Sequence, residues 1–155
     1  MKHSLVSRIR RLILANSEGN ALVEMAVTLP LMMFLVTGLC FMGLAVDNYI
    51  ILAHANDVGA RYLALRRGQL TDPCAQTVTA IQNAAPGLNT SQLSYDFTIG
   101  ASGDMQNTTS CTSATGDMAP STTATVTVYY KYPLMIYGWG PTTLTMQAAT
   151  SEVIQ

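Results

Sequence analysis

The fold of this chain follows from one stretch, Gly19-Asn20-Ala21-Leu22-Val23-Glu24, and from the uncharged segment 25–46 that comes directly after it. As an α-helix, that segment would be about 33 Å long, enough to cross a hydrocarbon core of about 30 Å. A carboxylate at the edge of such a helix is unfavourable unless another group pairs with it, so Glu24 is a candidate functional residue. The sequence therefore predicts a membrane-spanning helix that begins beside an acidic side chain.

The distribution of charge predicts how this helix is oriented. Four of the basic residues lie within the first eleven positions, namely Lys2, Arg8, Arg10 and Arg11. From Asn20 onward the chain has four basic residues and eight acidic ones. The positive-inside rule then predicts a cytoplasmic amino terminus and an exported remainder. Because this rule explains the basic leader, a nucleic-acid partner is not predicted.

The order of residues also indicates which kind of export signal this is. An ordinary secretory signal has a shorter apolar core, followed by small residues at the cleavage site. A lipoprotein signal needs a small residue directly before its cysteine, but Leu39 precedes Cys40. Cleavage after Gly19 would instead leave the apolar helix on the mature protein. That protein would begin at Asn20 and carry Glu24 at its fifth position.

Two segments carry a resemblance to a known family. The first is Glu18–Ala26, with Pro30 six positions after Glu24, and the second is Asn56–Tyr62. Together they resemble the TadE-like minor pseudopilins of the tight-adherence (Flp-type) pilus system, the second segment being similar to the Gly-Ala-Arg-Tyr segment that follows the span in that family. Many mature type IV pilins begin with phenylalanine, and the polar Asn20 argues against a major fibre-forming pilin.

The resemblance implies a structural role in a bacterial inner membrane. It implies cleavage after Gly19 by a prepilin-type aspartic peptidase, and partners among other pseudopilins, pilus-system membrane proteins and the lipid bilayer. Glu24 would pair with the freed amine of Asn20, in its own chain or in a neighbour, and Pro30 would loosen or kink the helix. The alternative is a single-pass anchored extracytoplasmic binding domain that is not processed and joins no pilus. Whether the protein enters an extracellular fibre is left open.

The whole chain is predicted to be α+β. A cytoplasmic leader (1–19) precedes the transmembrane helix (20–46), a periplasmic continuation of that helix (47–67) and a small extracytoplasmic domain (68–155). Apolar residues at helical spacing predict the buried stripe of the continuation: Ile51, Ala55, Val58, Tyr62 and Leu65.

Within the extracytoplasmic domain, Asp72-Pro73 predicts the start of a second helix that ends before Pro86-Gly87. Alternation of apolar and polar residues predicts three antiparallel strands packed on the long helix, at residues 93–99, 124–132 and 144–148. The segment between the first two strands is rich in Ser, Thr, Gly and Asn, which predicts a long surface loop.

The cysteines predict one disulfide. Cys74 and Cys111 lie in the exported part, and their bridge would close a loop of about 38 residues, worth about 4 kcal/mol in the chain-entropy model. Cys40, in the span, is predicted to fill apolar space, with an intermolecular contact as the alternative.

No catalytic, cofactor-binding or metal site is predicted, and no small-molecule substrate. His54 and Asp57 are three residues apart on the helix, but no nucleophile motif, phosphate-binding loop or metal-ligand spacing accompanies them. A solvated helix face explains both residues. The sequence therefore predicts a protein that is not an enzyme.

Overall fold

The computed structural model describes every residue except 1–16, 67–70, 101–102, 113–115, 117 and 135–141. At residues 17–20 and 134 it describes the backbone alone. The chain divides into two compact units, Met1–Leu44 and Ala45–Gln155. One helix, α2 (Ser17–Leu65), contributes residues to both units.

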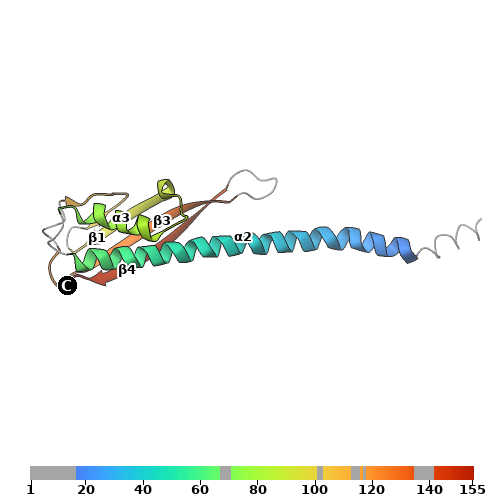
Figure 1. Cartoon of the computed structure of the whole chain (residues 1–155), viewed down its shortest axis with the longest axis horizontal. Helices are drawn as coiled ribbons and strands as arrows, with labels where there is room; N and C mark the ends of the chain where they lie inside the picture. Colours follow the sequence, from blue (N-terminus) through green and yellow to red (C-terminus); the bar gives the residue numbers. More distant parts are fainter. Residues whose placement is uncertain (1–16, 67–70, 101–102, 113–115, 117, 135–141) are drawn as a thin grey trace, which may run out of the picture. The chain divides into compact units, whose positions relative to one another are not determined.

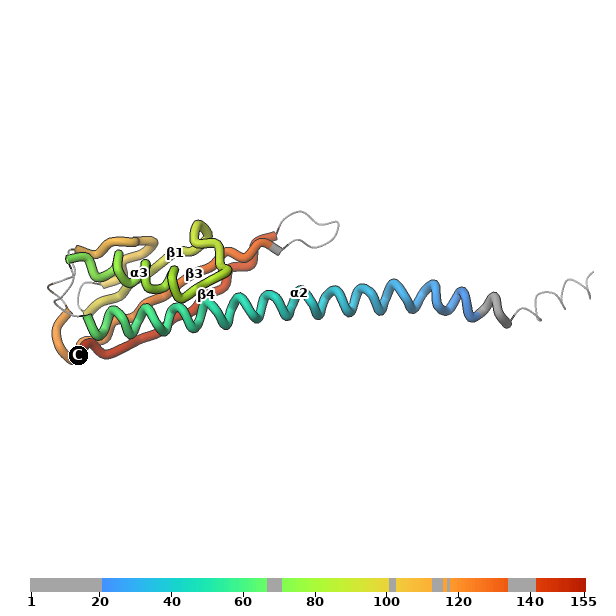
Figure 2. The backbone as a smooth tube through the Cα atoms, viewed as in Figure 1, coloured from blue at the N-terminus to red at the C-terminus, as the bar shows by residue number. Residues whose placement is uncertain are grey.

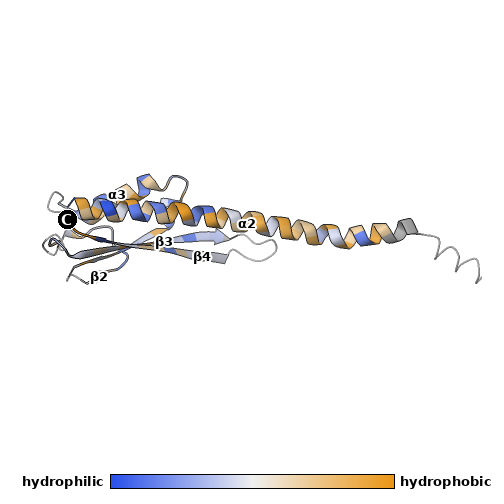
Figure 3. Ribbon diagram, turned by 90° about the horizontal axis from the view of Figure 1, so that it is seen from below, coloured by the Kyte–Doolittle hydropathy of each residue, from blue (hydrophilic) through white to orange (hydrophobic). Residues whose placement is uncertain are grey.

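In its described part, the first unit is the apolar portion of α2. Every residue from Ala21 to Leu44 is exposed, and this portion of the helix is coloured mainly as hydrophobic in Figure 3. Among the described residues, α2 is the one helix long and apolar enough to cross a membrane. A helix that is hydrophobic on all sides requires an apolar environment around it. The first unit is therefore consistent with a single-pass membrane anchor.

The second unit is a small α+β domain, as predicted (Figure 1). It contains residues 45–65 of α2, followed by α3 (Pro73–Ala84), the short 3-10 helix η1 (Thr90–Gln92), β1 (Leu93–Ile99), β2 (Asp104–Met105), β3 (Thr123–Leu134) and β4 (Thr142–Val153). The sheet is antiparallel with the order β2-β1-β3-β4. The three predicted strands are present, and the two-residue β2 is a fourth strand inside the predicted surface loop.

One face of this sheet forms the core. In register, Phe97 lies opposite Val126, and Val126 lies opposite Thr150. Both helices lie on this face, as Figure 3 shows edge-on. The strand residues buried there are Tyr95, Phe97, Ile99, Ala124, Val126, Val128, Tyr130, Met146 and Ala148. Because side chains alternate along a strand, the intervening Ser, Thr and Asp residues lie on the opposite face.

The buried stripe of α2 differs from the predicted one. Of the five predicted residues, Ala55 alone is buried, and Leu65 is 63% exposed. The residues that are buried are Leu52, Ala55, Asn56, Gly59, Ala60, Leu63 and Ala64. The helix packs against both α3 and the sheet, so its buried surface is broader than a one-sided stripe and is centred on other positions.

The second helix begins where the sequence predicted. Asp72 is its N-cap, and the Ala75 backbone N–H donates to the Asp72 Oδ1 at 3.1 Å. Pro73 follows in the first turn, where a missing N–H costs nothing because no carbonyl is available to accept from it. The helix ends at Ala84, before Pro86.

The carboxyl terminus lies beside the end of α2 (Figures 1 and 2). The Ile154 N–H donates to the Thr122 carbonyl at 2.8 Å, and the Gln155 N–H donates to the Ala64 carbonyl at 3.4 Å. The Ile154 side chain is 1% exposed. Ile154 therefore belongs to the core of the domain, and the Gln155 backbone connects the end of the chain to α2.

Candidate processing and assembly site

The predicted cleavage site lies in the first turns of α2. The helix begins at Ser17, so the backbone is helical at both Gly19 and Asn20. The leader residues before Ser17 lie outside the described residues. Cleavage after Gly19 stays a prediction.

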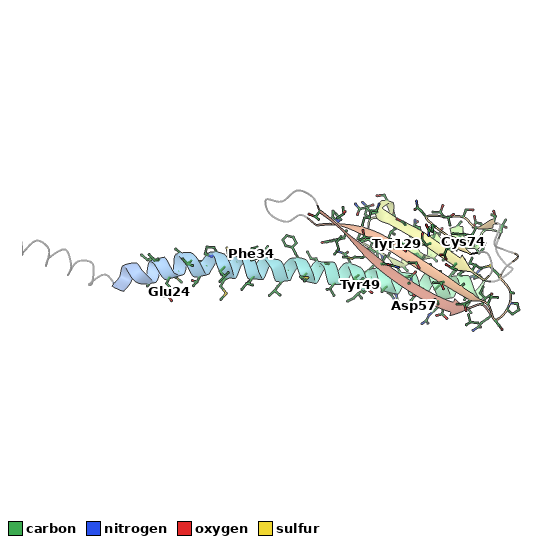
Figure 4. All side chains as sticks on the ribbon, turned by 180° about the vertical axis from the view of Figure 1, so that it is seen from behind. Glu24, Phe34, Tyr49, Asp57, Cys74 and Tyr129 are labelled. Carbon is green, nitrogen blue, oxygen red and sulfur yellow. A yellow bond between two sulfur atoms is a disulfide. The ribbon has the colours of Figure 1, made fainter. Side chains whose placement is uncertain are left out.

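Glu24 projects from α2, and its side chain is exposed (Figure 4). The Thr28 hydroxyl donates to the Glu24 backbone carbonyl at 2.9 Å and approaches the Met25 carbonyl at 3.4 Å. These bonds use the backbone of Glu24 and leave its carboxylate unengaged within the described part of the chain. The carboxylate can therefore accept a hydrogen bond or an ion pair from another molecule.

Pro30 lies inside α2, and the helix continues through it. Because proline has no N–H, the Ala26 carbonyl loses the donor that residue 30 would otherwise supply. In a membrane such a carbonyl requires a donor from a side chain, a water molecule or a neighbouring helix.

Further along the helix, the Thr37 hydroxyl donates to the Met33 carbonyl at 2.6 Å. The span thus satisfies the Thr37 hydroxyl internally.

The Gly-Ala-Arg-Tyr segment has a packing role in the second unit. Gly59 lies against α3, and a Cβ atom there would be 2.3 Å from Ile81 Cγ1 and 2.7 Å from Ile81 Cδ1. Carbon atoms in contact stay about 3.5–4.0 Å apart. The close approach of α2 and α3 at this point therefore requires glycine.

The two residues at the end of this segment connect α2 to its neighbours. The Arg61 guanidinium lies 3.1 Å from the Asp57 carboxylate and 3.9 Å from the Glu152 carboxylate of β4. Since these groups are solvent-accessible, each pair contributes little to stability. The Tyr62 hydroxyl donates to Gln76 Oε1 of α3 at 3.2 Å. The segment therefore links α2 to α3 and to β4.

The predicted disulfide is confirmed. Cys74, in the first turn of α3, is bonded to Cys111, and their Cα atoms are 5.4 Å apart. Both residues are buried. Cys74 is labelled in Figure 4. The bridge ties the segment after β2 to the beginning of α3.

The Asp72 carboxylate supports the same junction. Besides capping α3, its Oδ1 accepts a hydrogen bond from the Cys111 N–H at 3.1 Å, and its Oδ2 accepts one from the Ser110 hydroxyl. Desolvation of the carboxylate acts to raise the pKa of Asp72, but the hydrogen bonds from Ser110, Cys111 and Ala75 outweigh it and lower the pKa. The sequence placed Asp72 at the start of the helix but did not predict its contacts with Ser110 and Cys111.

Asn56 is a further residue that sequence reasoning missed. It is fully buried in α2, and its Nδ2 donates to the Val126 carbonyl at 3.1 Å and to the Thr150 hydroxyl at 3.0 Å. Its Oδ1 has no hydrogen-bond partner among the described residues. The one available signal was an asparagine between apolar helix positions. These bonds fix the rotation of α2 over β3 and β4.

His54 and Asp57, the two residues considered for chemistry, both lie on α2. His54 is exposed on α2, and Asp57 is engaged with Arg61. Cys40 is a free, exposed cysteine in the first unit. In the part of the chain that the structure describes, no group of three or more His, Cys, Asp or Glu residues could hold a metal ion.

A family model described as TadE-like protein matches residues 19–61, a segment that runs from the predicted cleavage site to Arg61. No curated protein and no solved structure matches the chain. Over residues 19–61 the chain is therefore similar to TadE-like proteins, as its sequence predicted, and this segment lies within the helix that is long and apolar enough to cross a membrane.

Proposed function

We propose that this protein is a minor pseudopilin that acts in the assembly of a tight-adherence pilus or a related secretion system. It is anchored in the bacterial inner membrane by α2, with a cytoplasmic amino terminus and a periplasmic domain. A prepilin-type peptidase removes the leader after Gly19. Its role is structural, and it acts through contacts with other pseudopilins or pilus-system membrane proteins, without a catalytic or cofactor site.

The observation that carries the proposal is the extent of the TadE-like match. It begins at Gly19 and includes Glu24, Pro30 and the segment that packs α2 against its own domain. The proposed processing site, the acidic residue and the anchor thus all lie within the matched segment. The disulfide between Cys74 and Cys111 supports export of the second unit, because disulfides persist in oxidising compartments such as the periplasm.

The proposed role of Glu24 follows from the cost of a charge near lipid. An unpaired carboxylate at the edge of the hydrocarbon region is unfavourable, and a nearby ammonium group relieves that cost. Cleavage after Gly19 would generate such a group at Asn20. The Glu24 carboxylate is exposed and has no partner among the described residues. It would form an ion pair with this ammonium group, in the same chain or in a neighbouring subunit.

Intact-mass measurement of the protein extracted from its native membrane tests the processing step. The expected species begins at Asn20, contains one disulfide and lacks the basic leader. Replacing Gly19 with a bulky residue should leave the full-length species. A wild-type protein that retains Met1 would instead support the plain membrane anchor that joins no pilus.

A second experiment tests the assembly step separately. In the Glu24→Gln variant, membrane insertion should be unchanged, and co-purification with partner subunits should fall by about tenfold or more, because the partner's ammonium group is left unpaired. The matched control is Thr37→Val, which removes a hydroxyl that already bonds within α2. Equal recovery of partners with Glu24→Gln and with wild type would rule out the proposed role of the carboxylate.

A further inference from the structure

The two edges of the sheet in the second unit differ in how they are covered. At one edge, β2 has two residues, and the segment after it continues along β1. There the Thr108 N–H donates to the Tyr95 carbonyl at 3.1 Å, and the Asn107 N–H donates to the Asp96 carboxylate at 2.7 Å. At the other edge lies β4, which has 12 residues and no further strand beyond it among the described residues (Figure 1).

The backbone of β4 directs alternate residues toward its uncovered side. The Ile154 N–H donates to the Thr122 carbonyl at 2.8 Å, and the Ile154 carbonyl accepts from the Ser121 N–H at 2.9 Å, so both groups of Ile154 point toward β3. In an antiparallel ladder this direction alternates from one residue to the next. The outward N–H and C=O groups between residues 145 and 153 are therefore those of Thr145, Gln147, Ala149, Ser151 and Val153, called here the open edge of β4.

The open edge lacks the features that protect most edge strands from pairing with another chain. Natural edge strands are often short, or they carry lysine, proline or a bulge. Residues 142–151 contain no charged residue, no proline and no glycine, and the register with β3 is continuous. None of the outward backbone groups bonds to another described residue. The open edge can therefore accept a new strand over about 27 Å.

The side chains of β4 limit which strand fits there. Met146 and Ala148 are buried on the side that the helices cover, whereas Thr145 and Gln147 are exposed on the opposite side. Because side chains alternate along a strand, an added strand would extend both surfaces. The matching segment therefore has small or apolar side chains toward α2 and polar side chains toward water.

The helix beside β4 makes the carboxyl-terminal end of the open edge acidic. The Asn56 Nδ2 donates to the Thr150 hydroxyl at 3.0 Å, which places α2 along β4. The Arg61 guanidinium lies 3.9 Å from the Glu152 carboxylate but 3.1 Å from that of Asp57. One cation is thus shared by two partly exposed carboxylates. This end is complementary to a basic side chain.

We propose that the open edge of β4 binds an extended segment of another pilus-system subunit, which adds a strand to the sheet and places a basic side chain beside Glu152. This inference rests on the proposed function and names a contact that the second unit makes in assembly. Backbone hydrogen bonds supply the affinity, and the alternating side chains and the charge supply the specificity. A second copy that pairs through its own β4 fits less well, because Glu152 is the one charged residue of that strand and a second β4 brings no cation.

Hydrogen exchange followed by mass spectrometry tests the proposal on the full chain. The protein is compared in detergent, alone and in complex with the partner subunits recovered from its native membrane, and fragmentation in the gas phase assigns exchange to single residues. In the protein alone, the amides of the open edge should exchange rapidly, whereas the intervening amides are protected by β3. In the complex, exchange at the open edge should slow by about tenfold or more. Unchanged exchange there, in a complex that contains partner subunits, would overturn the inference and leave the proposed function intact.

A pair of variants at Ala149 tests the backbone hydrogen bonds themselves. Ala149→Pro removes one outward N–H, and an edge strand tolerates proline where that N–H faces solvent. The matched control, Ala149→Thr, keeps the N–H. Recovery of partner subunits with Ala149→Pro should fall by about fivefold or more relative to this control. Equal recovery, with both variants folded by near-ultraviolet circular dichroism, would rule out strand addition; if the proline variant does not fold, the exchange measurement on the wild type decides.

The remaining outcomes distinguish the partners. Glu152→Gln should lower the recovery of partner subunits at low ionic strength by about threefold, and an unaltered recovery would reject the basic side chain. Slow exchange at the open edge of the purified protein that increases with protein concentration would overturn the inference in favour of a second copy. Absence of any partner subunit from the wild-type preparation would reject the proposed function and this inference with it.

Discussion

Replacing Gly59 with alanine should destabilise the second unit although alanine favours helix. The added methyl group would lie 2.3 Å from Cγ1 and 2.7 Å from Cδ1 of Ile81, and 3.4 Å from Cγ2 of Thr77. Ile81 is fully buried, and its branched side chain has few alternative rotamers. The clash therefore requires α3 to move away from α2.

Two opposing terms give the magnitude. Overpacking of a core by one methyl group typically costs about 1–3 kcal/mol. Glycine to alanine in a helix interior gains about 1 kcal/mol of helix propensity. Because the shortest distance involves Cγ1, which cannot move without displacing the rest of the buried side chain, the upper part of the first range applies. The expected net loss of stability is about 1–2 kcal/mol.

Guanidinium unfolding of the full chain in detergent micelles, followed by near-ultraviolet circular dichroism, measures this loss. The matched control is Gly43→Ala in the same helix, where no heavy atom lies within 4 Å of the new Cβ. It should change the stability of the second unit by less than about 0.5 kcal/mol. In a double-mutant cycle, Ile81→Ala should cost less in the Gly59→Ala background than in wild type, by about 1 kcal/mol or more.

A Gly59→Ala variant that is more stable than wild type would refute the reasoning. It would mean that helix propensity outweighs the contact with Ile81. A destabilised variant without coupling to Ile81→Ala would equally reject this contact as the cause.

Three further predictions concern the domain, each measured by the same unfolding assay. Asp72→Ala should destabilise by about 0.5–2 kcal/mol at neutral pH, because it removes the N-cap of α3. Since the native pKa of Asp72 is lowered, the contribution of its carboxylate should be complete above the unfolded-state pKa and disappear as pH falls through the native pKa, so equal pH profiles of variant and wild type would contradict this role. Reduction of Cys74–Cys111 should cost about 4 kcal/mol in the chain-entropy model, whereas the Cys40→Ser variant should show the same loss on reduction as wild type. Asn56→Asp should cost about 2 kcal/mol or more, since a carboxylate cannot donate to the Val126 carbonyl, and an unchanged midpoint would show that this bond is dispensable.

Local patterns in the sequence were sufficient for much of this fold. Residues 25–46 predicted the anchor because a long uncharged run has few other stable environments. The start of α3 was predicted because Asp72 and Pro73 cap a helix through contacts within one turn. The strands were predicted because period-two alternation reflects a sheet with one buried face. The TadE-like segment was recognised for a similar reason, since its residues are contiguous.

Contacts between distant segments were decided by the tertiary structure alone. The rotation of α2 was predicted incorrectly because helical periodicity indicates a single buried face, whereas α3 and the sheet cover this helix from two directions. Asn56 is stable in the core only because the Val126 carbonyl and the Thr150 hydroxyl reach it from β3 and β4. Gly59 is required only because the Ile81 side chain packs directly against its Cα. The sequence by itself determined which segments are helix, strand and anchor, since those depend on neighbouring residues; which side chains meet depends on how the segments pack, and that was settled only in three dimensions.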